Sequence, residues 1–195
     1  MMFKKTVMGA SLAAAALVPL AQAQAAEYKI DTEGQHAFVQ FKISHLGYSY
    51  ILGSFEEFSG SFQYDPDNPE ASAASVEVDV TSLTTNHAER DKHIKSADFL
   101  DAGEYPTASF TSTDFEPTGE GEGVLTGDLT LHGETQEIEM PVTLLGEGED
   151  PWGGYRAGFE GSTSLTLSNY GIDMSQFPDA MQELELYVTF EGVRQ

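Results

Sequence analysis

An alternation of apolar and polar residues with a period of two runs from Tyr28 almost to the end of the chain, and it limits the possible folds more than any other feature. In Ser75–Val80, for example, three valines lie on one side of the backbone and two acids on the other. This pattern is typical of a β-strand with one buried and one solvated face, whereas a helix repeats every three or four residues. Helical spacing recurs convincingly only in Asn86–Leu100. The sequence therefore predicts an all-β domain with one short helix.

About eight strands can be counted along the chain. They are predicted at His36–Ser44, Phe55–Tyr64, Ser75–Val80, Thr107–Phe115, Leu125–Leu131, Ile138–Leu144, Arg156–Leu167 and Leu184–Phe190. Short polar turns join most of them, as in an antiparallel sheet, and such a sheet removes its free edges by closing. We therefore expect an eight-stranded antiparallel β-barrel, which is wide enough either to fill itself with side chains or to hold one small ligand.

Several local features refine this picture. Gly60 suggests a bend or bulge in its strand, or a strand that leads into the turn after it, and Pro141 indicates a sheet edge or a bulge. Two acidic segments, Gly119–Gly123 and Gly146–Gly154, are predicted to be a turn and a loop. The helix needs an N-cap, for which three residues are candidates. These are Thr84, Thr85 and Asn86.

Composition excludes several classes of protein. Met1–Ala25 has the positive start, apolar centre and small residues at its end that are typical of a secretory signal peptide. Its removal would leave a domain of residues 26–195 with seven Lys and Arg against 32 acids, a net charge of −25. Nucleic acid and anionic membrane surfaces would repel such a protein. There is no cysteine and no later apolar run long enough to span a bilayer, so we expect a soluble, exported domain without disulfides.

The inward faces of the predicted strands supply candidates for a ligand pocket. Small residues such as Ala108 and Gly161 are mixed with larger ones, which either leaves room for a slender apolar ligand or only matches the taper of the barrel. The predicted lining residues are Val39, Phe41, Ile43, Val78, Phe110, Leu129, Leu131, Phe159, Leu165, Leu186 and Val188. The stretch Tyr170–Met181 is either an apolar flap over the opening or a loop packed on the end of the barrel.

A polar site at the mouth of the barrel is the second candidate. Arg90, Lys92 and Lys95 are three of only seven basic residues after Ala25, and their clustering would suit a phosphate, pyrophosphate or other polar head group. Trp152 and Arg156 are candidates for the same mouth. The alternative is that all of these cations pair with nearby carboxylates.

Known catalytic motifs were not found. The chain has no Gly-x-Ser-x-Gly sequence, and its five histidines form no helical pair with the spacing that zinc prefers. His87 and His93 are six residues apart and would point in different directions on a helix. We therefore expect no catalytic residue, no metal site and no cofactor.

Several motifs, in this order, resemble those of the YceI family. They are Tyr28–Asp31, Gly34–Phe38, His45–Tyr48, Thr85–His93, Ser96–Leu100, Tyr105–Pro106 and Asp150–Gly154 with Arg156–Phe159. The resemblance runs from Ala26 to the C-terminus. It implies a lipocalin-like eight-stranded barrel whose long apolar pocket binds a polyisoprenoid or an isoprenoid quinone-like lipid, without catalysis, in the periplasm. The helix motif and the Asp150–Phe159 segment match the family, but they do not say which side chains contact lipid.

Together these observations predict a periplasmic protein that carries or sequesters an isoprenoid lipid, as a monomer or a homodimer. Two alternatives stay open. One is a stress-related binding protein with a packed barrel and a protein partner. The other is a lipid-modifying enzyme, with His87 or His45 as its general base.

Overall fold

The computed structural model describes residues 25–195, so the predicted signal peptide lies outside the described residues except for its last residue. The strands are β1 (Ala26–Ile30), β2 (Phe38–His45), β3 (Ser49–Phe55), β4 (Phe58–Tyr64), β5 (Ala73–Asp79), β6 (Leu83–Thr84), β7 (Thr107–Gly119), β8 (Glu122–Leu131), β9 (Glu134–Glu149), β10 (Tyr155–Thr166) and β11 (Glu183–Arg194). The single α-helix is α1 (Ala88–Ile94), and short 3₁₀ turns are η1 (Pro69–Ala71), η2 (Val80–Ser82), η3 (Leu167–Tyr170) and η4 (Asp179–Met181). Within residues 25–195, no helix is long and apolar enough to cross a membrane.

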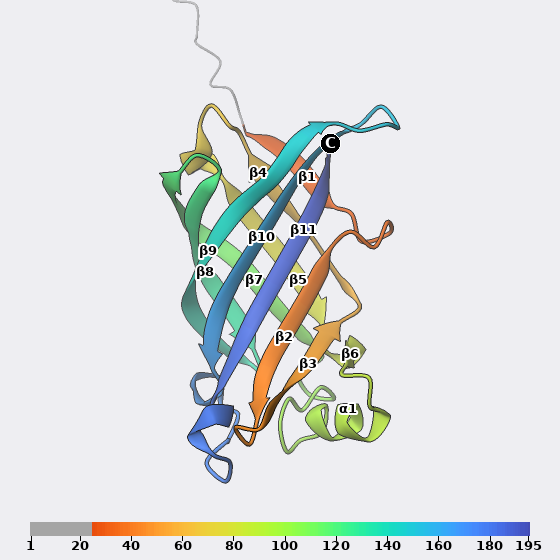
Figure 1. Ribbon diagram of the computed structural model, residues 1–195, viewed down its shortest axis with the longest axis vertical. Coiled ribbons are helices and arrows are strands. Elements are labelled where there is room, and N and C mark those ends of the chain that lie inside the picture. The colour runs from red at the N-terminus through yellow and green to blue at the C-terminus, as the bar shows by residue number, and fades with distance from the viewer. Residues whose placement is uncertain (1–24) are drawn as a thin grey trace, which may run out of the picture.

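Eight of these strands form a closed antiparallel barrel (Figure 1). The ring runs β1-β4-β5-β7-β8-β9-β10-β11, and β1 closes it by pairing with both β4 and β11. This confirms the predicted all-β fold, eight-stranded barrel and short helix. The alternation in the sequence is the cause, since each strand turns one row of side chains inward and one outward.

At two places in the barrel, two shorter strands follow one another where a single long strand would otherwise lie. The strand β11 pairs with β1 through Gly192–Arg194 and with β2 through Leu184–Thr189, so β1 and β2 lie along the same edge of β11. Likewise, the predicted strand Phe55–Tyr64 is divided, because β3 ends at Phe55 and β4 begins at Phe58. The break lies at Glu56–Glu57. Gly60 pairs regularly with Val76, and β4 leads into the turn at Asp65–Asn68, which is the second of the two predicted alternatives.

Pro141 and the acidic segments are explained by the pairing. The β9–β10 ladder ends at Val142, so Pro141 pairs with Val124 of β8 and lies on a local edge toward β10. The acidic segments are more regular than we predicted. The β7–β8 turn is only Glu120–Gly121, with Gly121 at φ +71°, and β9 continues to Glu149 before the chain reverses.

The helix is shorter than predicted, and its N-cap is a different residue. His87 caps it, since its Nδ1 accepts a hydrogen bond from the backbone N–H of Arg90 at 3.2 Å. After Lys95 the chain folds into turns, with the N–H of Leu100 donating to the carbonyl of Ile94 at 3.0 Å. The predicted cap Thr85 is instead buried beneath the helix, where its hydroxyl contacts side chains of α1.

Two apolar clusters fill the barrel ends. In the half near the C-terminus, the rings of Tyr28 and Phe62 stack with their centroids 5.0 Å apart. The ring of Phe159 packs edge-on against Phe62, with 5.4 Å between the centroids. In the half near α1, the segment between β10 and β11 folds inward, and its Ile172 and Met174 are buried against Leu165. The stretch Tyr170–Met181 is therefore packed on the end of the barrel.

Candidate functional site: an apolar cavity inside the barrel

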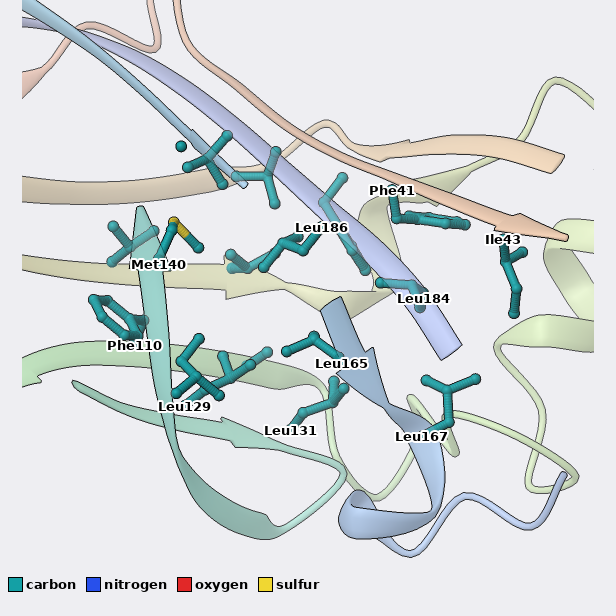
Figure 2. Close-up of a pocket in the computed structure, with 18 of the residues that line it drawn as sticks. Phe41, Ile43, Phe110, Leu129, Leu131, Met140, Leu165, Leu167, Leu184 and Leu186 are labelled. Carbon is teal, nitrogen blue, oxygen red and sulfur yellow. The ribbon is translucent and has the colours of Figure 1, made fainter. Parts of the chain in front are cut away.

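A cavity of about 500 Å³ extends along the inside of the barrel, and residues of both clusters line it (Figure 2). Its wall is built by inward rows from all around the ring. The structure places all eleven predicted lining residues on this wall: Val39, Phe41, Ile43, Val78, Phe110, Leu129, Leu131, Phe159, Leu165, Leu186 and Val188. The barrel interior is thus not completely filled by its own side chains, and what remains open is lined mainly by hydrocarbon.

Cross-strand pairs of glycine and a large side chain keep the middle of the barrel open. The ring of Phe41 lies across Gly53, so that a Cβ at residue 53 would be only 2.2 Å from its Cζ. The ring of Phe110 lies against Gly127, so that a Cβ at residue 127 would be only 2.6 Å from Cζ of Phe110. Because these rings lie against glycine backbone, they cover the wall instead of projecting into the lumen.

Residues outside the predicted strands complete the cavity. Ile94, Phe99 and Leu100 from α1 and the turns after it line the α1 end, together with Met174 and Phe177 from the segment between β10 and β11. The helical spacing of Asn86–Leu100 did not assign that segment to the pocket, whereas Tyr170–Met181 was predicted as either a flap over the opening or a loop packed on the end of the barrel. Their role depends on how the loops fold over the barrel, which alternation within strands does not reveal.

Three polar side chains also line the cavity near α1: His45, Arg90 and His93. The guanidinium of Arg90 is held by Thr85, since its Nε donates to the hydroxyl and its Nη2 donates to the carbonyl oxygen, each at 2.7 Å. Asp91 lies on the other side of the same hydroxyl. Burial alone would raise the pKa of Asp91, but hydrogen bonds from Thr85 and Thr84 lower it, so this carboxylate stays charged.

The other two cations of the helix segment do not line the cavity in the described part of the chain. Lys92 is exposed on α1. Lys95 donates from its Nζ to the carbonyl oxygens of Thr81 and Leu83, at 3.0 and 3.2 Å. Lys95 therefore fastens α1 to the neighbouring β5–β6 connection.

Trp152 lies in the turn between β9 and β10, and Arg156 lies at the start of β10. Figure 1 shows this turn at the opposite end of the barrel from α1, so the five predicted mouth residues do not form one site. Arg156 pairs with three carboxylates, at 2.6 Å from Asp31, 2.8 Å from Asp150 and 2.6 Å from Glu191. The pKa of Asp31 is lowered chiefly by Arg156, and that of Asp150 by the backbone N–H of Gly154 and then by Arg156. Of the two roles considered for Arg156, the structure shows the local salt bridge.

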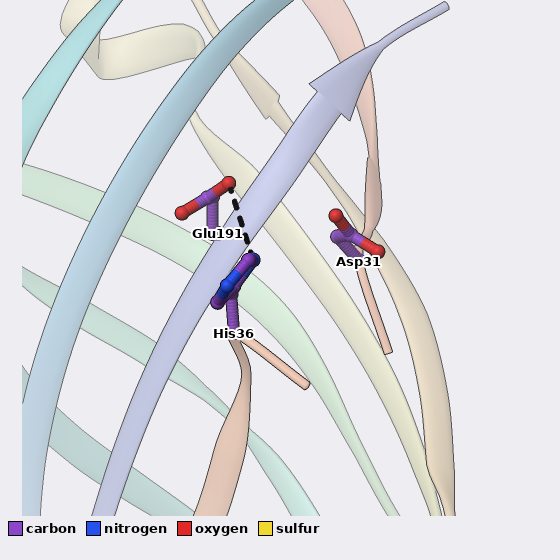
Figure 3. A group of neighbouring side chains, drawn as sticks. All are labelled: Asp31, His36 and Glu191. Atoms are coloured by element: carbon purple, nitrogen blue, oxygen red, sulfur yellow. Dashed lines mark ion pairs between the residues drawn. The ribbon is translucent and has the colours of Figure 1, made fainter. Parts of the chain in front are cut away.

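Asp31, His36 and Glu191 form a group that could in principle hold a metal ion (Figure 3). The Nδ1 of His36 is 3.9 Å from a carboxylate oxygen of Glu191. However, Nη1 of Arg156 already donates to both Asp31 and Glu191 at 2.6 Å. A cation bound there would meet the guanidinium, so this arrangement favours an ion-pair network over a metal site.

Comparison with known proteins agrees with this architecture. The model of the family described as YceI-like domain matches residues 28–192. A UPF0312 protein of Pseudomonas syringae pv. tomato is 54% identical over 193 residues, which cover 99% of each chain. The solved YCEI protein of Campylobacter jejuni is similar with a TM-score of 0.71 and 25% identity, over 79% of this chain and 91% of that one. A polyisoprenoid binding domain from Saccharophagus degradans shares the fold, with a TM-score of 0.63 and 14% identity, over 86% of this chain and 98% of that domain.

Proposed function

Because the chain belongs to the YceI-like family, and because its barrel encloses an apolar cavity, we propose that it binds a polyisoprenoid or isoprenoid quinone-like lipid without chemically changing it. The cavity is the observation that carries this proposal. Within the described residues most of its lining is aliphatic and aromatic. Of its polar residues, His45, Arg90 and His93 lie at the α1 end, and the others are Gln63, Ser72, Ser109 and Glu160. A long apolar chain matches such a lining, and a polar end group at α1 would meet His45, Arg90 and His93. The polyisoprenoid binding domain of similar fold supports the same class of ligand.

The size of the cavity makes binding without strong polar contacts reasonable. A ligand that buries about 400 Å² of apolar surface gains on the order of 10 kcal/mol at 25 cal/mol per Å². Immobilising the ligand costs about 4 kcal/mol or more. At most about 6 kcal/mol then remains, which corresponds to a dissociation constant of roughly 40 μM before any polar contact is counted.

The two alternatives have less support. A fully packed barrel does not agree with an open volume of about 500 Å³. For an enzyme, His87 is a poor general base, because its Nδ1 already caps α1. His45 lies at the cavity, but among the described residues it belongs to no group of possible metal ligands. We also propose export to the periplasm, from the character of Met1–Ala25.

Native mass spectrometry of the purified protein, followed by titration with ubiquinone or a polyprenol in detergent, tests this function. Leu129→Glu places a charge in the apolar wall and should weaken binding at least about 100-fold. Glu185→Gln, which changes an outward residue paired with Lys42, should bind normally. Ala108→Phe fills part of the lumen without adding charge and gives a second test if the glutamate variant does not fold.

The proposal is wrong if the wild-type protein carries no lipid and binds neither added compound. Chemical change of a bound lipid in a time course would instead support the enzyme.

A further inference from the structure

A long segment without acids interrupts the strongly acidic sequence. Asp and Glu account for 32 of the 195 residues, yet none of the 22 residues Gly34–Phe55 is acidic. Glu33 precedes this segment and Glu56–Glu57 follow it. At the average frequency about one residue in six is acidic, so three or four acids would be expected. The segment forms β2, β3 and the turn between them.

The same hairpin carries most of the exposed large apolar side chains in residues 25–195. Tyr48 is 89% exposed, Tyr50 and Leu52 are each 65% exposed, and Leu46 is 43% exposed. We call these four residues the apolar hairpin surface. Burial in the barrel does not explain them, because Tyr48, Tyr50 and Leu52 point away from the cavity. Lys42 lies 5.1 Å from the ring of Tyr50, and it is the only Lys or Arg of the segment.

The apolar hairpin surface is continuous with the mouth of the cavity. Leu46 belongs to both, and its neighbour His45 also lines the cavity. Figure 1 shows that the β2–β3 turn reaches the end of the barrel where α1 and the β10–β11 connection lie. A lipid that enters or leaves at this end passes beside the hairpin. This step assumes the proposed function, because an isoprenoid lipid is too apolar to reach the cavity through water.

We propose that the apolar hairpin surface docks on a bilayer of zwitterionic lipids and brings the cavity mouth to the membrane. Tyrosine and leucine suit that position, since a tyrosine ring buries its apolar body and keeps its hydroxyl in the polar layer. The lack of acids removes the groups that lipid phosphates would repel and that would lose water on contact. The rest of the protein, with a net charge of −23 for the chain, disfavours an anionic bilayer.

Flotation of the purified protein with phosphatidylcholine vesicles tests this docking. The variant Tyr48→Ser/Tyr50→Ser removes two exposed rings, neither of which lines the cavity. Leu145→Ser/Trp152→Ser is the matched control, because those side chains are 59% and 76% exposed. They lie near the end of β9 and in the β9–β10 turn, which Figure 1 shows at the opposite end of the barrel from α1. Two further measurements are the affinity for ubiquinone in detergent and the rate at which the protein extracts ubiquinone from the vesicles.

We expect the hairpin variant to lose about tenfold or more of its vesicle partition and extraction rate, while the control keeps both. Both variants should bind ubiquinone in detergent as the wild type does. Replacing half of the phosphatidylcholine by phosphatidylglycerol at low salt should weaken flotation of the wild type.

The docking proposal is overturned if the wild type does not float with vesicles, or if both variants lose flotation equally. It is also overturned if analytical ultracentrifugation shows that the wild type is a dimer, and the hairpin substitutions dissociate this dimer without changing flotation. In that case the outer edge of β3, which pairs with β6 only at Ser54 and Phe55, would serve a second protein chain. If the protein floats but does not bind ubiquinone in detergent, the docking stands and the proposed function fails.

Discussion

The contact between Phe41 and Gly53 gives a quantitative test of how the cavity wall is built. In Gly53→Ala the new Cβ would lie 2.2 Å from Cζ and 2.5 Å from Cε1 of the Phe41 ring. Carbon atoms in van der Waals contact are about 3.5–4.0 Å apart, so the ring has to move by more than about 1 Å. Phe41 is buried and its ring centroid is 5.9 Å from that of Phe55, so it has little room to move outward. Overpacking of this kind costs about 1–3 kcal/mol.

Gly146→Ala is the matched control. Gly146 is also in a strand, but a Cβ there meets nothing within 4 Å, and its φ is not in the left-handed region. Both substitutions reduce the entropy of the unfolded chain equally, which stabilises by about 0.4–1 kcal/mol. We therefore expect Gly146→Ala to be neutral or slightly stabilising and Gly53→Ala to be destabilising. Because the entropy effect cancels, the difference between the two should equal the overpacking cost of about 1–3 kcal/mol.

Urea unfolding measures this difference, and ubiquinone binding reports the position of the ring. A ring displaced into the lumen should weaken binding of the ligand, because Phe41 lines the cavity. The double variant Gly53→Ala/Phe41→Leu should recover part of the lost stability, since the smaller side chain removes the clash. Equal stabilities of the two alanine variants, or additive effects in the double variant, would refute the proposed role of Gly53.

Two further predictions concern the ends of the barrel. In the wild type, Asp31 and Asp150 have lowered pKa values, so they stabilise the fold above a pH of about 4 and this stability is lost as the pH falls through their folded pKa values. Arg156→Met removes the cation that chiefly lowers the pKa of Asp31, so the stability that the wild type loses as the pH falls below about 4 should be smaller in the variant; the same loss of urea stability in both proteins would contradict the network. At the other end, Thr85→Val removes the hydroxyl between Arg90 and Asp91, and should speed hydrogen exchange in residues 86–100 more than in β10. If the substitution speeds hydrogen exchange equally in residues 86–100 and in β10, the contact of Thr85 with Arg90 and Asp91 does not stabilise the helix.

The wall of the cavity could be predicted from the sequence because a strand alternates its faces regardless of its partner. Leu129, Leu165 and Leu186 could therefore be assigned to the interior without knowing the order of the strands in the ring. Whether the interior was full or open could not be predicted, since Ala108 and Gly161 fit both possibilities. That outcome depends on register, which places the ring of Phe41 directly across from Gly53 and the ring of Phe110 diagonally against Gly127.

The polar residues were harder to assign for a related reason. Clustering in sequence drew attention to Arg90, which lines the cavity, but of its neighbours Lys92 is exposed and Lys95 is bound to backbone carbonyls. Arg156 was grouped with them because it is also a rare cation near aromatic residues. Its three carboxylate partners come from β10's neighbouring turn, from β11 and from the loop after β1, and only the closed ring brings these together.

The distribution of acids links the surface to the cavity. A strong negative charge is compatible with a carrier only if the part that receives an apolar ligand is free of acids, because buried or membrane-facing carboxylates lose their hydration. The 22 residues without acids meet this condition on both faces of one hairpin. Phe41 and Ile43 line the cavity on the inner face, and Tyr50 and Leu52 are exposed on the outer face. The inner face alone would need acids excluded only at every second residue, so their absence from both faces of the hairpin agrees with the proposed docking of its outer face on a membrane.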